Sequence, residues 1–358
     1  ASDVYKRQKE EWSQEYQELK GLLSESEYKE ARSSTLNAFY TPPTVIKAMY
    51  QILENMGLST GNVLEPSCGV GNFMGLVPES MQNIQMYGVE LDPISGKIAG
   101  QLYQKNRIEV KGFEKTEYPE SFFDCVIGNV PFGNYQVSDR KYDKYSLMIH
   151  DYFIAKSLDL IRPGGVVAVI TSSRTMDKES EKVRLQFAEK ADLLGAIRLP
   201  ENAFRKNAGT DVVSDILFFQ KRDRAVLQKP SWVEVGETEE GYKINSYFVE
   251  HPEMVLGDFV LESNQYGRME VTVKPRKQNS LEEQLKEVIP FIQGQITVRE
   301  FDELDLNETE DSILADPSVK NFSFAKVGKQ VYYRENSRMN RMDLPAVTTE
   351  RVLSLIHI

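Results

Sequence analysis

The chain has 358 residues, of which 41% are hydrophobic and 27% are charged, a composition typical of a soluble globular protein with one large domain or two. It has no apolar run of the roughly 18 residues that a membrane-spanning helix needs and no recognisable signal peptide. The net charge is −11, from 43 basic and 54 acidic residues. Because nucleic-acid-binding surfaces are usually basic, any contact with DNA must come from a local basic patch or from a partner domain.

Cysteine and histidine usage narrows the chemistry. Cys68 and Cys125 both fall in predicted core segments, which argues against a disulfide framework and favours a reducing cytoplasm. The three histidines lie far apart without the spacing of metal ligands, so we expect no metal site. They are His150, His251 and His357.

Both ends of the sequence look foreign to the fold. The first eight residues, ASDVYKRQ, and the last six, LSLIHI, resemble translated sequencing-adapter sequence. We therefore exclude residues 1–8 and 353–358 from the fold and expect the natural protein to continue beyond both ends.

The predicted elements alternate between helices and strands. Residues 9–36 are charged with sparse apolar positions at helical spacing, which predicts an amphipathic lead-in. A helix at 45–56 follows Thr41, a candidate N-cap, and two prolines suited to a first turn. Strands are then predicted at 62–65, 86–90, 107–110, 123–127, 166–171, 193–199 and 212–220. With helices between most of them, this order predicts an α/β fold with a mostly parallel seven-stranded sheet and helices on both faces.

The alternation ends near Asp223. Residues 224–352 contain short strand-like pieces, turns and one charged helix at 281–288, and we interpret them as an accessory or linker extension of α+β type. The predicted organisation is therefore a helical lead-in at 9–36, a central α/β domain at 37–223 and the extension at 224–352.

A loop with two glycines, Glu65-Pro66-Ser67-Cys68-Gly69-Val70-Gly71, follows the first strand. Glycines let the backbone approach a ligand, as in dinucleotide-binding folds, but the third glycine of that fingerprint is replaced by Met74. Glu65 also places a carboxylate at the strand end, which suits a cationic amine better than a pyrophosphate. Glu90 ends the second strand roughly 20 residues further on, where a carboxylate binds a ribose diol, and Asp92 is a second candidate. Solvated strand-end charges are the alternative interpretation of both acids.

Two later strand ends also carry candidate groups. Phe113 and Glu114 follow the third strand, where they could meet an adenine ring and its amino group. The fourth strand ends in Asn129-Val130-Pro131-Phe132. The Asn129 side-chain oxygen and the Val130 carbonyl can both accept hydrogen bonds from one amino group, while the proline restricts the backbone and the Phe132 ring offers a face to a flat base. In isolation, this tetrapeptide is equally an ordinary strand-ending turn.

Two segments interleave aromatic and basic residues, as base stacking and phosphate contact require. The first spans residues 135–145, and the second spans residues 200–210 and could cover the other face of a bound base. A solvated loop is the alternative for each. The candidates are Tyr135, Arg140 and Lys141 in the first segment, and Phe204, Arg205 and Lys206 in the second.

The order and spacing of these motifs resemble the gamma-class N6-adenine DNA methyltransferases. The matching segments are Phe39-Tyr40-Thr41-Pro42-Pro43, the glycine loop at 65–71, Glu90-Leu91-Asp92-Pro93 and the tetrapeptide at 129–132. The sequence is most similar to the methylase portion of very large helicase-methylase proteins of plasmids, phages and conjugative elements. Residues 207–217 also resemble a later motif of this subgroup. The resemblance covers residues 37–221.

This resemblance implies a Rossmann-like methyltransferase fold with S-adenosylmethionine as the cofactor. Thr41, Glu65, Ser67 and Gly69 would line its methionine end, and Glu90 would bind the ribose hydroxyls. Phe113 and Glu114 would flank the adenine, although the family more often has the acid before the aromatic residue. The implied cofactor-binding residues are Tyr40, Thr41, Glu65, Ser67, Gly69, Gly71, Glu90, Asp92, Phe113 and Glu114.

The resemblance further implies methyl transfer to the N6 amino group of adenine in DNA, by direct displacement on a flipped-out base. Asn129, Val130, Pro131 and Phe132 would be the catalytic residues, with the two acceptors drawing the amino hydrogens out of the ring plane. The family usually has proline where this chain has Val130, so we expect the carbonyl to keep its role in a less rigid loop.

Two alternatives remain open. The same chemistry could act on another amine, such as guanine N2 in RNA or a protein glutamine amide, or the chain could be a non-catalytic cofactor-binding or DNA-recognition module of a larger helicase protein. As partners we expect DNA and a helicase region in the same natural polypeptide, with no membrane and no metal. The expected setting is the bacterial cytoplasm, with a gene carried by a mobile element and a connection to restriction-modification.

Overall fold

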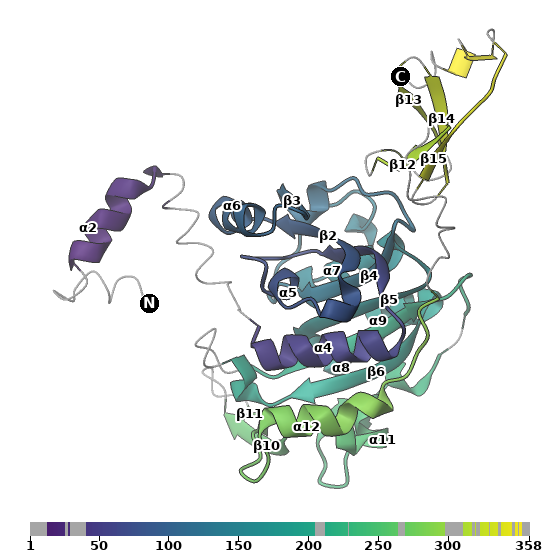
Figure 1. Ribbon diagram of the computed structural model, residues 1–358. Helices are drawn as coiled ribbons and strands as arrows, with labels where there is room; N and C mark the ends of the chain where they lie inside the picture. Colours follow the sequence, from purple (N-terminus) through teal and green to yellow (C-terminus); the bar gives the residue numbers. More distant parts are fainter. Residues whose placement is uncertain are drawn as a thin grey trace.

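A seven-stranded sheet with the strand order β3-β2-β1-β4-β5-β7-β6 forms the centre of the computed structural model (Figure 1). Strand β7 is antiparallel to both of its neighbours, and the other adjacent pairs are parallel. The strands are β1 (Thr60–Glu65), β2 (Asn83–Glu90), β3 (Arg107–Val110), β4 (Phe123–Asn129), β5 (Ile161–Ser172), β6 (Ala191–Leu199) and β7 (Ser214–Lys221). The predicted mostly parallel seven-stranded α/β fold is confirmed.

The structure describes most of the chain with several gaps. The described residues are 13–25, 28, 41–204, 212–227, 229–263, 269–297, 311–316, 319, 323–328, 330–335, 338–345, 348–349 and 351–352. Among the predicted site residues, Tyr40, Arg205 and Lys206 lie outside these ranges.

The central strands are buried along nearly their whole length. In β4 only the last residue, Asn129, is partly exposed, and β7 is buried from Ser214 to Phe219. Continuous burial is typical of a sheet covered on both faces. The buried acids within these two strands, Asp124 and Asp215, are paired with Arg162 and Arg198. The sheet therefore offers polar side chains to a ligand mainly at the strand ends.

Helices connect the strands. They are α4 (Pro43–Asn55), α5 (Asn72–Gly75), α6 (Pro93–Leu102), α7 (Ile149–Leu160), α8 (Arg174–Asp177) and α9 (Lys182–Lys190). The structure corrects one predicted cap: Pro42, not Thr41, occupies the N-cap position of α4, and it makes no side-chain capping bond. The Thr41 hydroxyl instead accepts a hydrogen bond from Asn129, 88 residues away. No helix among the described residues combines the length and apolarity needed to cross a membrane.

The predicted lead-in and extension contain further elements. In the lead-in, α2 spans Ser13–Leu22. The extension contains β8 (Val235–Glu237), β9 (Lys243–Asn245), α11 (Ser246–Glu250), β10 (Asp258–Ser263), β11 (Met269–Lys274), α12 (Leu281–Val288), β12 (Ser312–Leu314), β13 (Phe324–Val327), β14 (Gln330–Glu335) and β15 (Arg338–Arg341).

The extension consists of two parts with different cores. Trp232, Phe248 and Ile292 are buried in the same hydrophobic cluster as the central sheet. Strands β12–β15 instead form a separate four-stranded antiparallel sheet around a small cluster of their own. We therefore propose that residues 224–297 belong to the central unit and that residues 311–341 form a separate one.

A buried ion cluster holds together β6 and β7, the last two strands in the order of the sheet. Arg198 in β6 is 1% exposed, and its Nε and Nη2 both donate to the Asp215 carboxylate in β7 over 2.8 Å. Its Nη1 lies 2.8 Å from Asp177 at the end of α8, and its guanidinium stacks 4.2 Å from the ring centre of Phe248 in the extension. Burial raises the pKa of Asp215 to about 6, although the guanidinium opposes this shift. The cluster therefore joins two strands, a helix and the extension.

Asp215→Ala removes the bidentate partner and leaves the guanidinium buried. We expect the free energy of unfolding to fall by about 3–5 kcal/mol, measured by urea denaturation. As a matched control, Asp192→Ala removes the more exposed partner of Arg222 and should cost less than about 1 kcal/mol. Similar small losses in both variants would contradict the structural role of the cluster.

Candidate active site

Three predicted residues meet at one edge of the sheet. Glu65, Glu90 and Asn129 are the last residues of β1, β2 and β4. Because these strands are parallel neighbours, their carboxyl ends lie side by side, which is where ligands bind in open α/β sheets. The topology therefore brings together the acids of the predicted cofactor site and the amide of the predicted catalytic tetrapeptide.

The two glycines after β1 have different tasks. Both have left-handed backbones, with φ of +54° at Gly69 and +87° at Gly71, which residues with a Cβ rarely adopt. A Cβ at Gly71 would lie 2.4 Å from the Tyr103 ring, whereas one at Gly69 would meet nothing within 4 Å. Gly71 therefore permits packing, and Gly69 borders open space at the strand ends.

Glu90 holds this loop against the second strand. Its Oε2 accepts a hydrogen bond from the Gly69 N–H over 2.7 Å, and its Oε1 accepts one from the Asp92 N–H over 2.8 Å. Burial raises the pKa of Glu90, and these backbone hydrogen bonds partly offset that effect. The carboxylate is thus fixed at the place where the sequence predicts a ribose contact.

Asp92 has a role that the sequence analysis missed. Its Oδ2 accepts a hydrogen bond from the Ser95 N–H over 2.8 Å and so caps α6. Its Oδ1 is buried and has no hydrogen-bond partner within the described ranges. One oxygen of Asp92 therefore caps the helix. The other lacks a donor, which a ligand could supply.

Glu65 is the most unusual acid of the site. It is 2% exposed, and its Oε2 is buried without a hydrogen-bond partner in the part of the chain that the structure describes. Burial, and then the charge of Glu90, raise the pKa of Glu65 well above its usual range. A buried carboxylate without a partner is costly, so this position fits a ligand that brings a cationic donor.

The tetrapeptide at 129–132 is tied to the glycine loop and to Thr41 through Asn129. Its backbone carbonyl accepts a hydrogen bond from Ser67 Oγ over 2.6 Å, and its Nδ2 donates to Thr41 Oγ1 over 3.2 Å. Since Thr41 accepts from the amide nitrogen, the amide oxygen is directed away from Thr41. Asn129 is therefore positioned through both its backbone and its side chain.

The rest of the tetrapeptide is firmly placed. Val130 is 2% exposed, and its N–H donates to the Ile170 carbonyl over 3.0 Å, which extends the pairing of β4 with β5 by one residue. Phe132 is partly buried and packs against the main core. The hydrogen bond at Val130 restricts the backbone where the family more often relies on proline.

Phe113 and Glu114 differ in accessibility. They lie in a 3-10 helix after β3. Phe113 is 2% exposed, and its ring centre lies 4.8 Å from that of Phe153 in α7. Its carbonyl accepts a hydrogen bond from Lys156 Nζ over 2.7 Å. Glu114 is partly exposed, so it is the more accessible of the two for an adenine contact.

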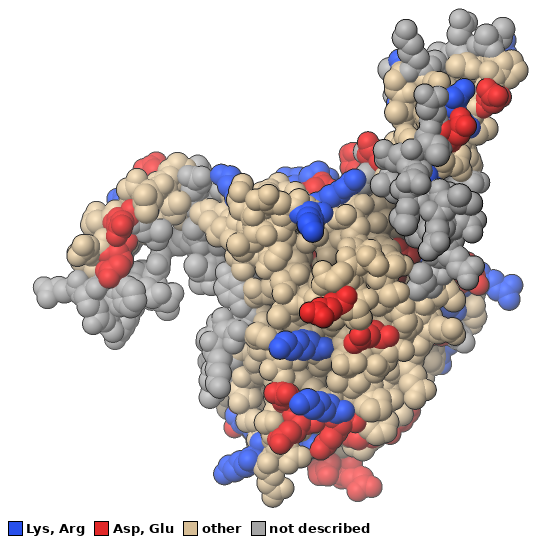
Figure 2. Space-filling view, in the orientation of Figure 1, with Lys and Arg blue, Asp and Glu red and all other residues tan. Residues whose placement is uncertain are grey.

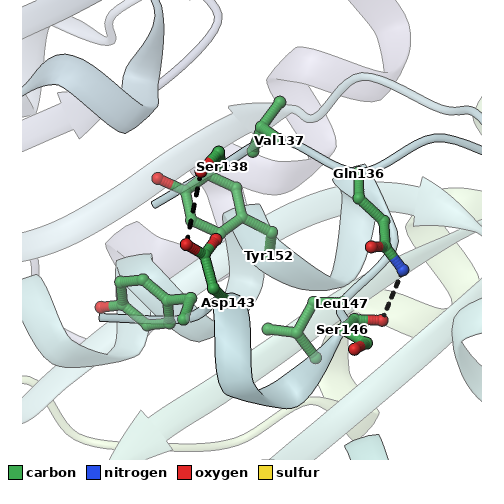
Figure 3. A pocket seen from close by; sticks show the side chains of 8 residues that line it. Gln136, Val137, Ser138, Asp143, Ser146, Leu147 and Tyr152 are labelled. Atoms are coloured by element: carbon green, nitrogen blue, oxygen red, sulfur yellow. Dashed lines mark hydrogen bonds between the residues drawn. The ribbon is translucent and has the colours of Figure 1, made fainter. Parts of the chain in front are cut away.

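Residues 135–145 form a hollowed loop between the tetrapeptide and α7. Tyr135 and Arg140 are exposed. This loop, the two residues that follow it and Tyr152 of α7 line a partly open pocket of about 330 Å³. Figure 3 shows the side chains that line it. The lining residues are Gln136, Val137, Ser138, Tyr142, Asp143, Ser146, Leu147 and Tyr152.

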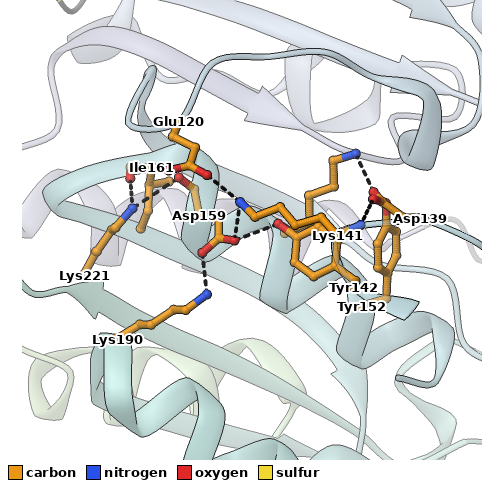
Figure 4. A network of polar contacts seen from close by, with 10 residues as sticks. Glu120, Asp139, Lys141, Tyr142, Tyr152, Asp159, Ile161, Lys190 and Lys221 are labelled. Carbon is orange, nitrogen blue, oxygen red and sulfur yellow. Dashed lines mark hydrogen bonds and ion pairs between the residues drawn. The ribbon is translucent and has the colours of Figure 1, made fainter. Parts of the chain in front are cut away.

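Two predicted DNA contacts have other partners in the structure. Lys141 pairs with Glu120 over 2.5 Å and with Asp159 over 2.8 Å (Figure 4), so its charge is already balanced. Phe204 is 1% exposed within the main core, because its apolar ring packs inward from the turn after β6. These placements argue against a phosphate contact by Lys141 and base stacking by Phe204.

Comparisons with known proteins agree with the geometry. A family model described as N-6 DNA Methylase matches residues 22–247, which is more than half of the chain. The chain therefore belongs to the N-6 DNA methylase family, and the resemblance to N6-adenine methyltransferases is confirmed at that level.

Two relatives and one solved structure illustrate the extent of the similarity. The chain is 33% identical over 201 residues to the Defense against restriction protein B of Escherichia phage P1, covering 54% of this chain and 9% of that protein. It is 25% identical over 148 residues to the Modification methylase CviBIII of Paramecium bursaria Chlorella virus NC1A, covering 40% of this chain and 39% of that protein. A modification subunit of a putative type I restriction enzyme from Vibrio vulnificus YJ016 gives a TM-score of 0.45 at 17% identity, covering 76% of this chain and 64% of that one. The chain thus spans well under half of both curated relatives.

S-adenosylmethionine is the cofactor that this family and fold imply. The strand ends fit it, because the buried oxygens of Glu65 and Asp92 need donors and Gly69 borders open space. No group of three potential metal-binding side chains occurs among the residues that the structure describes.

Glu65→Gln should weaken S-adenosylmethionine binding by about 10- to 100-fold, because it removes the charge that pairs with a cationic donor. The carboxyl must be ionised to bind a cation. Affinity in the wild type should therefore fall as the pH drops through the raised pKa of Glu65, and the variant should lose this dependence. Isothermal titration calorimetry at several pH values measures both effects. Glu79→Gln at an exposed position is the control, and unchanged binding by Glu65→Gln would contradict the assignment.

Val130→Pro should not rigidify the tetrapeptide, because proline has no N–H to donate to Ile170. We expect the free energy of unfolding to fall by about 1 kcal/mol, measured by urea denaturation. Amide hydrogen exchange provides an independent check, since the Val130 amide should exchange slowly in the wild type. Rapid exchange there, or a more stable proline variant, would rule out this explanation.

Proposed function

We propose that the chain is the catalytic part of an adenine-specific DNA methyltransferase, which transfers a methyl group to the N6 amino group of adenine. The observation that carries this proposal is the position of Asn129. Thr41 and Ser67 orient it at the sheet edge where Glu65 and Glu90 end their strands. Membership of the N-6 DNA methylase family supports DNA as the substrate.

The task of the tetrapeptide is to make a poor nucleophile reactive. The lone pair of the adenine amino group is delocalised into the ring. The Asn129 side-chain oxygen and the Val130 carbonyl would each accept a hydrogen bond from the amino group. These bonds would hold its two hydrogens out of the ring plane and so localise the lone pair on the nitrogen. Orientation by two fixed acceptors supplies much of the rate. Both buried cysteines are dispensable in this scheme.

The remaining site residues hold the two reactants. S-adenosylmethionine, when bound, supplies an electrophilic methyl group. Glu65 would hold the cationic amine of its methionine end, and Glu90 with Asp92 would bind the ribose hydroxyls. In duplex DNA the adenine has to leave the base stack, at a cost of a few kcal/mol, and the Phe132 ring would provide a stacking surface that offsets part of this cost.

One labelling experiment distinguishes DNA methylation from methylation of another acceptor and from a non-catalytic role. The chain is incubated with radiolabelled S-adenosylmethionine and, separately, with DNA, RNA or a protein mixture. We expect the label in DNA as N6-methyladenine. Label in RNA or in protein glutamine would redirect the substrate assignment, and cofactor binding without any transfer would leave only a recognition module.

Asn129→Ala should abolish transfer while S-adenosylmethionine binding stays nearly intact, because the amide oxygen acts on the amine and not on the cofactor. Thr41→Val should lower kcat about tenfold, since the amide loses the hydroxyl that orients it. Thr41→Ser keeps that hydroxyl and should restore most of the rate. Single-turnover transfer and calorimetry separate the two readouts, and equal loss of binding and transfer in Asn129→Ala would refute its role.

We also propose that this unit works inside a longer polypeptide. The similarity to a small part of a phage protein named for defence against restriction supports a mobile-element origin and a connection with restriction-modification. The expected neighbour is a helicase region, and the expected compartment is the bacterial cytoplasm. Mapping methylated adenines in a host that expresses the full-length gene tests this setting and yields the recognition sequence.

A further inference from the structure

The sheet edge has a cofactor side and a substrate side. Glu65 and Glu90 end β1 and β2 on one side of Asn129. On its other side lie the end of β5 and, because β7 is antiparallel to both β5 and β6, the end of β6 as well. A nucleic acid that delivers its amine to Asn129 while the cofactor occupies the first side must therefore approach over β5 and β6.

Arg174 stands on this substrate side, two residues after β5. Its Nη1 donates to Asn134 Oδ1 over 3.3 Å, and Asn134 follows the tetrapeptide by two residues. Its Nη2 lies 3.7 Å from Glu270 Oε1, and its side chain is 60% exposed. The guanidinium thus contacts the catalytic loop on one side and an acid of the β10–β11 hairpin on the other.

The hairpin is anchored along the same edge. Thr272 Oγ1 donates to Glu201 Oε2 over 2.8 Å, and Lys274 Nζ donates to Glu201 Oε1 over 2.7 Å. Glu201 lies two residues after β6, so the hairpin contacts the turns that follow both β5 and β6. The paired strands of the hairpin therefore lie beside the end of the sheet over which we place the DNA.

The pairing of Arg174 is weaker than that of neighbouring cations. Lys274 lies 2.7 Å from both Glu201 and Glu262, and Lys178 pairs with the fully buried Asp151. An exposed pair at the distance of Arg174 and Glu270 contributes little and is easily exchanged. On the face that Figure 2 shows, the described basic side chains are interspersed with acidic ones. In the whole sequence 54 acidic residues outnumber 43 basic ones, so a single well-placed cation matters more in this protein than in a basic one.

We propose that Arg174 binds a DNA phosphate beside the target adenine and that Glu270 occupies the guanidinium until DNA displaces it. The planar fork of arginine suits phosphate recognition. Because the same guanidinium contacts Asn134, phosphate binding also positions the catalytic loop. The identity of the nucleic acid rests on the proposed function, whereas the contact itself is measured without turnover.

Binding of a fluorescein-labelled DNA duplex, followed by anisotropy at several salt concentrations with S-adenosylhomocysteine present, tests the proposal. Arg174→Ala should lower the affinity about tenfold and reduce the salt slope by about 1. Arg174→Lys keeps the positive charge without the planar guanidinium, and its affinity for DNA should lie between those of the wild type and Arg174→Ala. Glu270→Gln should raise the affinity several-fold, because it removes the competing carboxylate.

Arg107→Ala is the matched control, since Arg107 is the first residue of β3, the outermost strand on the side of the sheet away from β5 and β6. Thermal melting confirms that each variant folds. Equal effects of Arg174→Ala and Arg107→Ala on DNA affinity would overturn the phosphate contact. A lower affinity of Glu270→Gln would show that Glu270 stabilises the hairpin and does not compete with DNA for Arg174. A wild-type chain that binds DNA through Arg174 but transfers no methyl group would refute the proposed activity and leave this contact standing.

Discussion

The site depends on the hydrogen bond from the Ser67 hydroxyl to the Asn129 carbonyl. One partner belongs to the glycine loop after β1, and the other ends β4, so this contact fixes the distance between that loop and the tetrapeptide. Thr41 adds a third segment by accepting from the Asn129 amide. Three stretches that are remote in sequence thus converge on one residue, and none of them could move alone without misplacing the amide.

Holding Glu65 buried imposes an opposite constraint. The fold keeps a carboxylate out of water without a described partner, which opposes folding whenever the group is ionised. Such local strain is common at ligand sites, where a ligand relieves it. The main core can carry this cost because the residues beside Glu65 in β1 and β4, such as Val63, Leu64 and Ile127, are apolar and fully buried.

The convergence of Glu65, Glu90 and Asn129 in the candidate site could be predicted because its signals are local. Apolar runs ending in polar residues located β1, β2 and β4, and parallel topology then placed their ends together. The partners could not be predicted, because they lie far away in sequence. Thr41 reads locally as a cap but contacts Asn129, and Lys141 and Phe204 read as DNA contacts but meet Asp159 and the main core. The valine of the tetrapeptide suggested a looser loop, yet its N–H supplies a restraint that proline lacks.

The shared core of the sheet and residues 224–297 determines what can be cut from the protein. The segment at its end is bound to three parts of the central unit: Ile296 N–H donates to the Met56 carbonyl over 2.7 Å, Gln220 Nε2 to the Gln295 carbonyl over 2.7 Å, and Arg162 to the Thr297 carbonyl. A fragment that ends after β7 would lack Trp232 and Ile292, and it would expose the parts of that core which these side chains cover. The smallest fragment that keeps the core intact thus ends near residue 297. Strands β12–β15 have a cluster of their own, but the Arg334 guanidinium in β14 lies 4.8 Å from the Phe122 ring centre, so a fusion that exchanges this sheet has to replace that contact.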